Sequence, residues 1–298
     1  MSDAGCRRVS ARHHGASLKS DWLSNAPRSL TRASRPLTLP RTSTQEAHMA
    51  LPIALQLYTV REELAADPAA TLQQVADAGY RHVELAGLHD VSAERFEQML
   101  DDAGLTALSA HEPADVLCND PAPAIERARL FGYRHIACSF HFEQRDAADA
   151  YRRAAGDYDR IGKALSDAGM VFSYHNHGFE FERLASGVRG FDVIMNETDP
   201  QHVKSQLDVF WVQHGGEEPI ARMRSLGDRV SQLHLKDMSP ERNFTEIGTG
   251  VVDLAAVVEA AGDTGAECMI VEQDSHWAGD SGVQSARISL DNLSKIVG

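Results

Sequence analysis

The sequence predicts a (β/α)₈ barrel, an α/β fold, as a single domain over residues 50–298, and three observations lead to this fold class. Short β-branched or apolar segments alternate with helical stretches about eight times. Glycine follows four predicted helices, at Gly79, Gly104, Gly132 and Gly169, where a left-handed cap is expected. A region of about 250 residues is the usual length for eight such units.

Strands and helices are expected to alternate in order along this region. The first four strands are predicted at residues 53–57, 82–85, 106–110 and 135–139, and their helices at 67–78, 92–103, 121–131 and 147–168. The last four strands are predicted at residues 171–177, 203–208, 230–234 and 269–272, and their helices near 190–196, 219–226, 254–261 and 282–296. A doubly wound open sheet would normally carry a glycine-rich loop after its first strand, but residues 55–61 contain no glycine. The barrel is therefore preferred.

Residues 1–48 differ in composition from the rest of the chain. They carry eight basic and three acidic residues, and Ser, Thr, Ala and Pro fill much of the remainder. No hydrophobic period is visible, which is typical of a disordered extension. The other interpretations are an organelle transit peptide, or an upstream stretch of a protein whose true start is Met49.

Charge and cysteine content exclude several classes of protein. The formal net charge of −14 argues against nucleic-acid binding, which requires a basic surface. No apolar run approaches the roughly 20 residues that span a membrane. The four cysteines are scattered and form no CxxC pair. A reduced, cytoplasmic setting is therefore expected.

Four segments in the second half of the chain end in residues that can bind a metal. The fifth strand ends in His175-Asn176-His177, and the last three strands end in Asp208, His234 and Glu272. Because the carboxyl ends of barrel strands meet at one mouth, we expect these side chains to lie close together. Each has an alternative role: Asp208, for example, could cap the following helix. Carboxylate and imidazole ligands together suit Mn²⁺, Co²⁺, Mg²⁺, Fe²⁺ or Zn²⁺.

Several motifs along residues 52–298 resemble one known family. They are Leu55-Gln56-Leu57-Tyr58-Thr59-Val60-Arg61, Gly79-Tyr80-Arg81-His82-Val83-Glu84-Leu85, Tyr174-His175-Asn176-His177-Gly178-Phe179-Glu180-Phe181, Leu207-Asp208, His234-Leu235-Lys236-Asp237, Gly248-Thr249-Gly250 and Val271-Glu272. Through these motifs the chain resembles the xylose isomerase-like barrels, in particular the sugar phosphate isomerase/epimerase group. That group includes tagatose/psicose 3-epimerases, inosose dehydratases and barrels that act on 3-keto-sugars.

The resemblance implies a set of metal ligands. In the family a Glu, Asp, His and Glu hold the cation, and Asp208, His234 and Glu272 match the last three positions. At the first position this chain has His175, so either His175 is the ligand or Glu180 supplies the missing carboxylate. We favour Glu180 here because it preserves the charge around the cation. His175 and His177 would then face the substrate, with His177 in a position for proton transfer.

The chemistry expected of such a site is enolisation of a sugar. A divalent cation polarises a carbonyl and stabilises the enediolate that forms when the neighbouring C–H is deprotonated. The resemblance gives Glu272 a role as base as well as ligand, with His177 or His175 as the acid on the other side. We therefore predict a metal-dependent sugar isomerase or epimerase for a keto-sugar, cyclitol or related carbohydrate. The alternatives are a dehydratase or eliminase on an inosose or 3-keto-glycoside, a catalytically inactive metal- or sugar-binding barrel, and an endonuclease IV-like nuclease.

The remaining candidates are substrate-binding residues. They are Glu84, His111, Lys236, Tyr58 and Trp211. The first two could bond sugar hydroxyls, Lys236 could hold an anionic oxygen or pair with Asp237, and the two aromatic residues could form an apolar wall. No glycine-rich loop or arginine cluster that would hold a phosphate is visible. The expected partner is a small carbohydrate, with no nucleic acid and no membrane, and the resemblance allows for a homo-oligomer.

Overall fold

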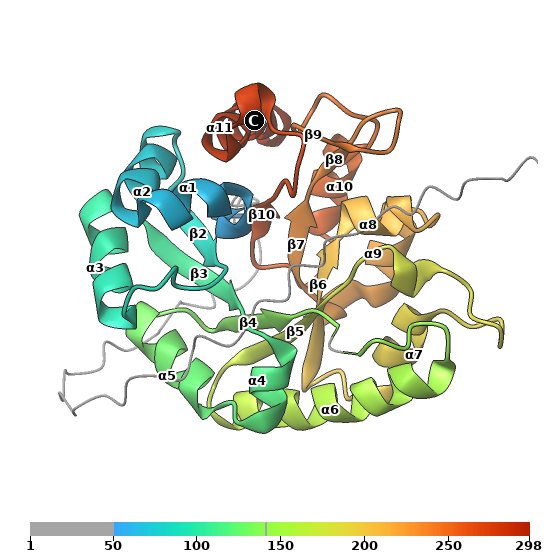
Figure 1. Ribbon diagram of the computed structural model, residues 1–298. Coiled ribbons are helices and arrows are strands. Elements are labelled where there is room, and N and C mark those ends of the chain that lie inside the picture. Colours follow the sequence, from blue (N-terminus) through green and yellow to red (C-terminus); the bar gives the residue numbers. More distant parts are fainter. Residues whose placement is uncertain (1–50, 141) are drawn as a thin grey trace, which may run out of the picture. The chain divides into compact units, whose positions relative to one another are not determined.

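The computed structural model describes residues 51–140 and 142–298, and within them eight parallel strands close into a barrel (Figure 1). The order around the barrel is β1-β10-β7-β6-β5-β4-β3-β2. The strands are β1 (Ile53–Gln56), β2 (His82–Leu85), β3 (Thr106–His111), β4 (His135–Cys138), β5 (Val171–His175), β6 (Val203–Asp208), β7 (Val230–Leu235) and β10 (Met269–Val271). The predicted fold class is confirmed.

Helices lie outside the ring of strands (Figure 1). They are α1 (Arg61–Ala66), α2 (Pro68–Asp77), α3 (Ala93–Ala103), α4 (Ala114–Asn119), α5 (Ala122–Phe131), α6 (Ala148–Asp167), α7 (Gly190–Glu197), α8 (Val209–His214), α9 (Pro219–Leu226), α10 (Leu254–Ala261) and α11 (Gly282–Val297). The predicted glycine caps are present: Gly104 and Gly132 end α3 and α5 with φ of 70° and 78°. The left-handed backbone conformation costs glycine little free energy because glycine has no Cβ, which is why glycine occupies these positions.

Several short elements were not predicted. The helices α1, α4 and α8 have six residues each. The segment after β7 forms an antiparallel ribbon of β8 (Asp237–Met238) and β9 (Phe244–Thr245). Six residues complete fewer than two helical turns, so they produce no hydrophobic period that the sequence alone could reveal.

The interior of the barrel near the carboxyl ends of the strands is polar, although it is buried. Side chains that are at most 1% exposed there include Gln56, Glu84, Ser109, Gln206 and Gln232. Buried polar groups are costly unless they are hydrogen-bonded. Gln56, Ser109 and Gln206 meet this cost by donating hydrogen bonds to Glu84.

The loop that follows β7 is held by one carboxylate. Asp237 is 1% exposed, and its Oδ1 accepts hydrogen bonds from the backbone N–H groups of Met238 and Val252 at 2.8 and 3.1 Å. Its Oδ2 accepts from Gly248 and Gly250, both at 2.9 Å. A side chain at Gly250 would collide with the Asp237 carboxylate, so glycine is required for this close approach.

Replacing Asp237 by alanine is therefore expected to destabilise the protein strongly. Four backbone donors would lose their acceptor, and each buried donor left unpaired costs at least about 1 kcal/mol. We expect a loss of about 4 kcal/mol, or a fall in melting temperature of about 8 °C or more for a domain of this size. Thermal unfolding followed by circular dichroism measures this.

The matched control is Asp253→Ala. Asp253 caps the start of α10 through a single exposed bond to the N–H of Ala256, which is worth about 1 kcal/mol. Equal effects of the two substitutions would contradict the assigned role of Asp237.

The prediction for residues 1–48 lies outside the described residues. Within the described part of the chain, no helix is both long and apolar enough to cross a membrane. Cys138 and Cys268 are buried in the core, and neither forms a disulfide bond with another described residue.

Candidate metal centre

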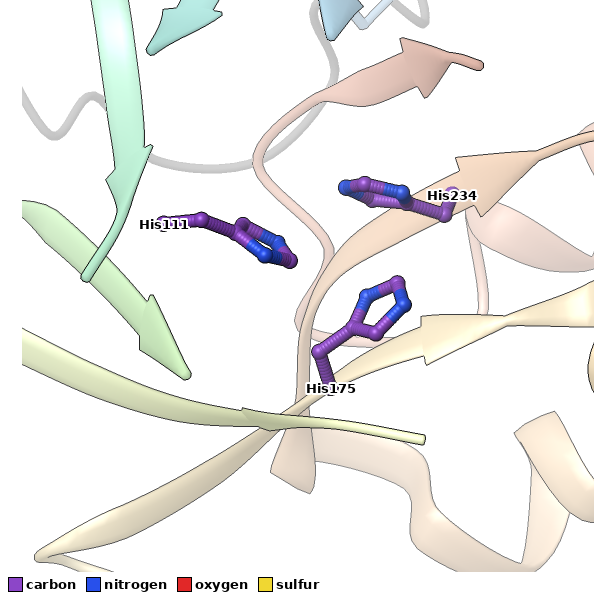
Figure 2. Close-up of side chains that lie close together, drawn as sticks. All are labelled: His111, His175 and His234. Carbon is purple, nitrogen blue, oxygen red and sulfur yellow. The ribbon is translucent and has the colours of Figure 1, made fainter. Parts of the chain in front are cut away.

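Four of the predicted side chains meet at the carboxyl end of the barrel. His175, Asp208 and His234 lie on β5, β6 and β7, and Glu272 follows β10 directly. One ligand atom from each lies within 4.8 Å of the other three, and all four residues are buried. In the sheet, Asp208 is the register partner of His234, which brings these two together. Figure 2 shows His175, His234 and His111, from β5, β7 and β3, pointing toward one another.

Asp208 uses its two oxygens differently. Its Oδ1 accepts a hydrogen bond of 3.0 Å from the backbone N–H of Trp211 and so caps α8. Among the described residues Oδ2 accepts no hydrogen bond, although it is buried. It lies 3.2 Å from Lys236 Nζ and 3.8 Å from His175 Nε2. The capping role considered for Asp208 is thus present, and it leaves one oxygen for a ligand.

His234 lies between two carboxylates. Its Nδ1 is 2.8 Å from Glu272 Oε2, and its Nε2 is 2.7 Å from Glu84 Oε2. Burial would lower the pKa of His234, but Glu84 and Glu272 outweigh it and raise the pKa to about 10. A carboxylate on one nitrogen is the usual partner of a metal-binding histidine, and a cation bound at the other nitrogen would take the place of its proton.

The environment of His175 favours the neutral form of its imidazole. Its Nδ1 lies 2.9 Å from Gln206 Oε1, which leaves Nε2 on the side of Asp208. Burial, together with the neighbouring His234, lowers the pKa of His175 well below its ordinary value. A neutral imidazole is the form that binds metals.

Lys236 is the cation of the cluster. It is 2% exposed, and its Nζ lies 2.7 Å from Glu272 Oε2, 3.2 Å from Asp208 Oδ2 and 3.1 Å from Asp274 Oδ2. Burial would lower the pKa of Lys236, but these carboxylates raise it well above its ordinary value. Its partners do not include Asp237, whose carboxylate is used by the loop after β7.

Glu180 is not a member of the four-residue group. It is fully buried, its Oε1 accepts a hydrogen bond of 2.7 Å from the Tyr174 hydroxyl, and its Oε2 accepts one of 3.0 Å from the backbone N–H of His177. Burial raises the pKa of Glu180 to about 7. The structure therefore brings His175, and not the favoured Glu180, next to Asp208, His234 and Glu272.

His177 lies above the cluster in an aromatic environment. Its ring is 5.2 Å from that of His175, 5.3 Å from Phe140 and 5.6 Å from Trp211. Burial and the nearby Lys236 lower the pKa of His177 to about 3, so the ring is neutral. Its Nδ1 has no hydrogen-bond partner within residues 51–140 and 142–298.

The predicted substrate-binding residues are in different situations. Glu84 is fully buried below the cluster, whereas the His111 side chain is 24% exposed and lies 5.5 Å from the His234 ring. The Tyr58 ring is covered on one face by the Arg61 guanidinium at 4.1 Å. Trp211 is part-buried, next to Phe244. Lys236 faces the carboxylates of Asp208, Glu272 and Asp274.

Two residues of the site were not predicted. Asp274 pairs with Lys236, and Gln206 contacts both His111 and His175. Gln206 lies two positions before Asp208 on the same strand, so the period of two in strands places both on the same face. That alternation was the signal that could have identified Gln206. Asp274 lies beyond the end of β10, where no such period applies.

The residues present fit a divalent cation. The buried Oδ2 of Asp208 accepts no hydrogen bond among the described residues, and its charged neighbour is Lys236 Nζ at 3.2 Å, so this oxygen can also face a cation. Two imidazoles and two carboxylates form the mixed nitrogen and oxygen set that first-row divalent ions accept. Lys236 and His234 lie among the carboxylates of Glu84, Asp208 and Glu272, which outnumber them, while burial raises the pKa of Asp274 to about 7.

The fold and this cluster define the class of protein: a parallel (β/α)₈ barrel with a candidate metal centre at the carboxyl ends of its strands. The chain belongs to the xylose isomerase-like TIM barrel family, whose model matches residues 72–296.

Individual relatives are more distant. An inosose dehydratase of Lacticaseibacillus casei is 26% identical over an alignment of 150 residues, and the match covers 42% of this chain and 48% of that protein. An inosose dehydratase from Geobacillus thermodenitrificans is 28% identical over an alignment of 140 residues, and the match covers 39% of this chain and 45% of that protein. The chain thus spans about half the length of the curated relatives it matches.

Solved structures share the fold over most of the chain. A sugar phosphate isomerase/epimerase from Parabacteroides distasonis has a TM-score of 0.74 at 24% identity and covers 83% of this chain and 100% of its own. The IOLI protein with a binding zinc atom has a TM-score of 0.66 at 12% identity, with coverage of 83% and 98%. These likenesses establish a common fold.

Proposed function

We propose that this protein is a divalent-metal-dependent isomerase or epimerase of a keto-sugar, a cyclitol or a related carbohydrate. The observation that carries the proposal is the convergence of His175, Asp208, His234 and Glu272 in one buried group. The family contains sugar isomerases and epimerases, which supports a carbohydrate substrate. We assign His175, rather than Glu180, as the fourth ligand.

A bound divalent cation would polarise the substrate carbonyl and so make the neighbouring C–H acidic. Glu272 is the base that we assign for removing this proton. Burial would raise the pKa of Glu272, but Lys236 and His234 hold it well below the ordinary value, so the carboxylate is ionised. Lys236, with its three carboxylate partners, carries the positive charge that can stabilise a developing oxyanion.

Return of the proton requires a second group. We assign His177, because its ring lies beside that of His175 and its Nδ1 has no partner among the described residues. The ring is neutral, so it passes on a proton that it first takes up from solvent. Return to the opposite face of the same carbon gives an epimer, and return to the neighbouring carbon gives an isomer.

The second candidate is a dehydratase. The relatives with the matching segments are named inosose dehydratases. In addition, β5 presents an imidazole where the family resemblance implies a carboxylate. Elimination needs one base and one acid for the leaving hydroxyl, and Glu272 with the protonated Lys236 supplies both.

Solvent exchange tests the proposal. The metal-loaded protein, incubated in D₂O with free ketoses, inososes or 3-keto-glycosides, is expected to introduce deuterium next to the carbonyl, detected by NMR after metal removal. The EDTA-treated protein is expected to introduce none. The product then separates epimerase, isomerase and eliminase.

Two outcomes would contradict this function. Metal retention without exchange on any of these substrates would indicate a binding protein. Cleavage of abasic DNA by the metal-loaded protein would indicate a nuclease.

A further inference from the structure

The carboxamide of Gln206 lies fully buried between Glu84 and two imidazoles. Its Nε2 donates to Glu84 Oε1 at 2.6 Å and to Gln232 Oε1 at 3.0 Å. Its Oε1 lies 2.6 Å from His111 Nε2 and 2.9 Å from His175 Nδ1. One amide group thus contacts a carboxylate on one side and two histidines on the other.

This environment allows only one orientation of the amide. Turning it over would place Gln206 Oε1 against Glu84 Oε1 at 2.6 Å, where two acceptor oxygens would repel each other. The amino group must therefore face Glu84, and the oxygen must face the imidazoles. An oxygen can only accept, so His175 Nδ1 and His111 Nε2 must both carry a hydrogen.

The tautomer of His175 follows from this. A neutral imidazole has one N–H, so a hydrogen on Nδ1 leaves a lone pair on Nε2. That nitrogen lies 3.8 Å from Asp208 Oδ2, which accepts no hydrogen bond among the described residues. A metal ligand needs such a lone pair. Among the described residues, Gln206 is the hydrogen-bond partner of His175 Nδ1, so Gln206 selects this form.

Glu84 also contacts the second histidine. Its Oε2 accepts the hydrogen of His234 Nε2 at 2.7 Å, while His234 Nδ1 lies 2.8 Å from Glu272 Oε2. Glu84 is itself held by Ser109 Oγ and Gln56 Nε2, both at 2.6 Å. Its oxygens are therefore occupied by protein donors, and it is fully buried.

The geometry points to Glu84 and Gln206 as a buried pair of positioning residues: Glu84 fixes the orientation of the Gln206 amide, and Gln206 selects the Nδ1–H tautomer of His175 for metal binding. This inference deepens the proposed function and rests on it. It also assigns Glu84 a place below the site and not the contact with sugar hydroxyls that the sequence suggested.

Imidazole NMR of the metal-free protein provides the first test. Long-range ¹H–¹⁵N spectra distinguish a protonated Nδ1 from a protonated Nε2, and we expect His175 to be in the Nδ1–H form. The Nε2–H form in the wild-type protein would overturn the inference. No substitution is needed, so this test does not depend on a variant that folds.

The second test compares two neighbouring buried amides. Gln206→Met removes the bonds to His175 and Glu84 and is expected to weaken Zn²⁺ or Co²⁺ binding by roughly 10- to 100-fold, as the loss of an outer partner usually does. It should also give mixed His175 tautomers. Gln232→Met is the matched control, because Gln232 bonds Gln206 and Cys268 but neither imidazole. The control should keep the wild-type tautomer and affinity.

The results separate this inference from the proposed function. If Gln206→Met keeps the Nδ1–H form and the wild-type affinity, the inference is wrong even when the enzyme is active. If the wild-type protein binds metal and shows the expected tautomer but exchanges no substrate proton, the proposed reaction fails and the positioning role stands.

Discussion

Asp208→Asn is expected to abolish stable cation binding and, with it, activity. The substitution keeps the shape and the acceptor that caps α8 through the Trp211 N–H. It removes the negative charge of the oxygen that has no hydrogen-bond partner among the described residues. It also places an amide beside Lys236 Nζ, which is 3.2 Å from that oxygen. We expect a larger loss of affinity than the 10- to 100-fold associated with an outer partner.

The control for this substitution is Asp274→Asn. Asp274 also pairs with Lys236, at 3.1 Å, but it does not belong to the four-residue group. Metal content after dialysis, measured by atomic emission, should fall in Asp208→Asn and remain in Asp274→Asn. A full metal complement in Asp208→Asn would exclude this cluster as the metal site.

The second large effect is expected at the fourth ligand. His175→Ala should lose the cation, because His175 is the member of the group that β5 contributes. Glu180→Gln should retain it, since the Glu180 oxygens are used by the Tyr174 hydroxyl and the His177 N–H. Activity should nevertheless fall in Glu180→Gln, because a neutral amide is a weaker acceptor than a carboxylate for the His177 N–H that positions this residue.

Calorimetric titration with Co²⁺ or Zn²⁺ separates the two residues. Loss of binding in Glu180→Gln with normal binding in His175→Ala would reverse the assignment. It would restore the carboxylate ligand that charge balance favoured from the sequence.

Much of the fold could be predicted because its signals are local. The period of the strands, the period of the long helices and the glycine caps depend on residues a few positions apart. The helix α6, for example, was expected at 147–168 and spans Ala148–Asp167. The six-residue helices and the β8–β9 ribbon were missed because they are too short to show a period.

The candidate site was predictable in part for the same reason. Asp208 and His234 end their strands, and the carboxyl ends of parallel strands must meet in a closed barrel. The choice between His175 and Glu180 was a different problem, since five positions separate them along a strand end and a loop. Charge balance favoured the carboxylate, but the backbone after β5 turns Glu180 toward Tyr174.

The sequence by itself determined the barrel, its order of elements and which strand ends carry the polar side chains, because these are properties of neighbouring residues. Only the tertiary structure decided the partners of those side chains. Glu84 and His234 are 150 positions apart, and Gln206 and Glu84 are 122 apart, yet both pairs are in hydrogen-bond contact. Such contacts depend on how strands far apart in the chain are registered across the closed barrel and on which side-chain orientations satisfy every buried donor and acceptor at once.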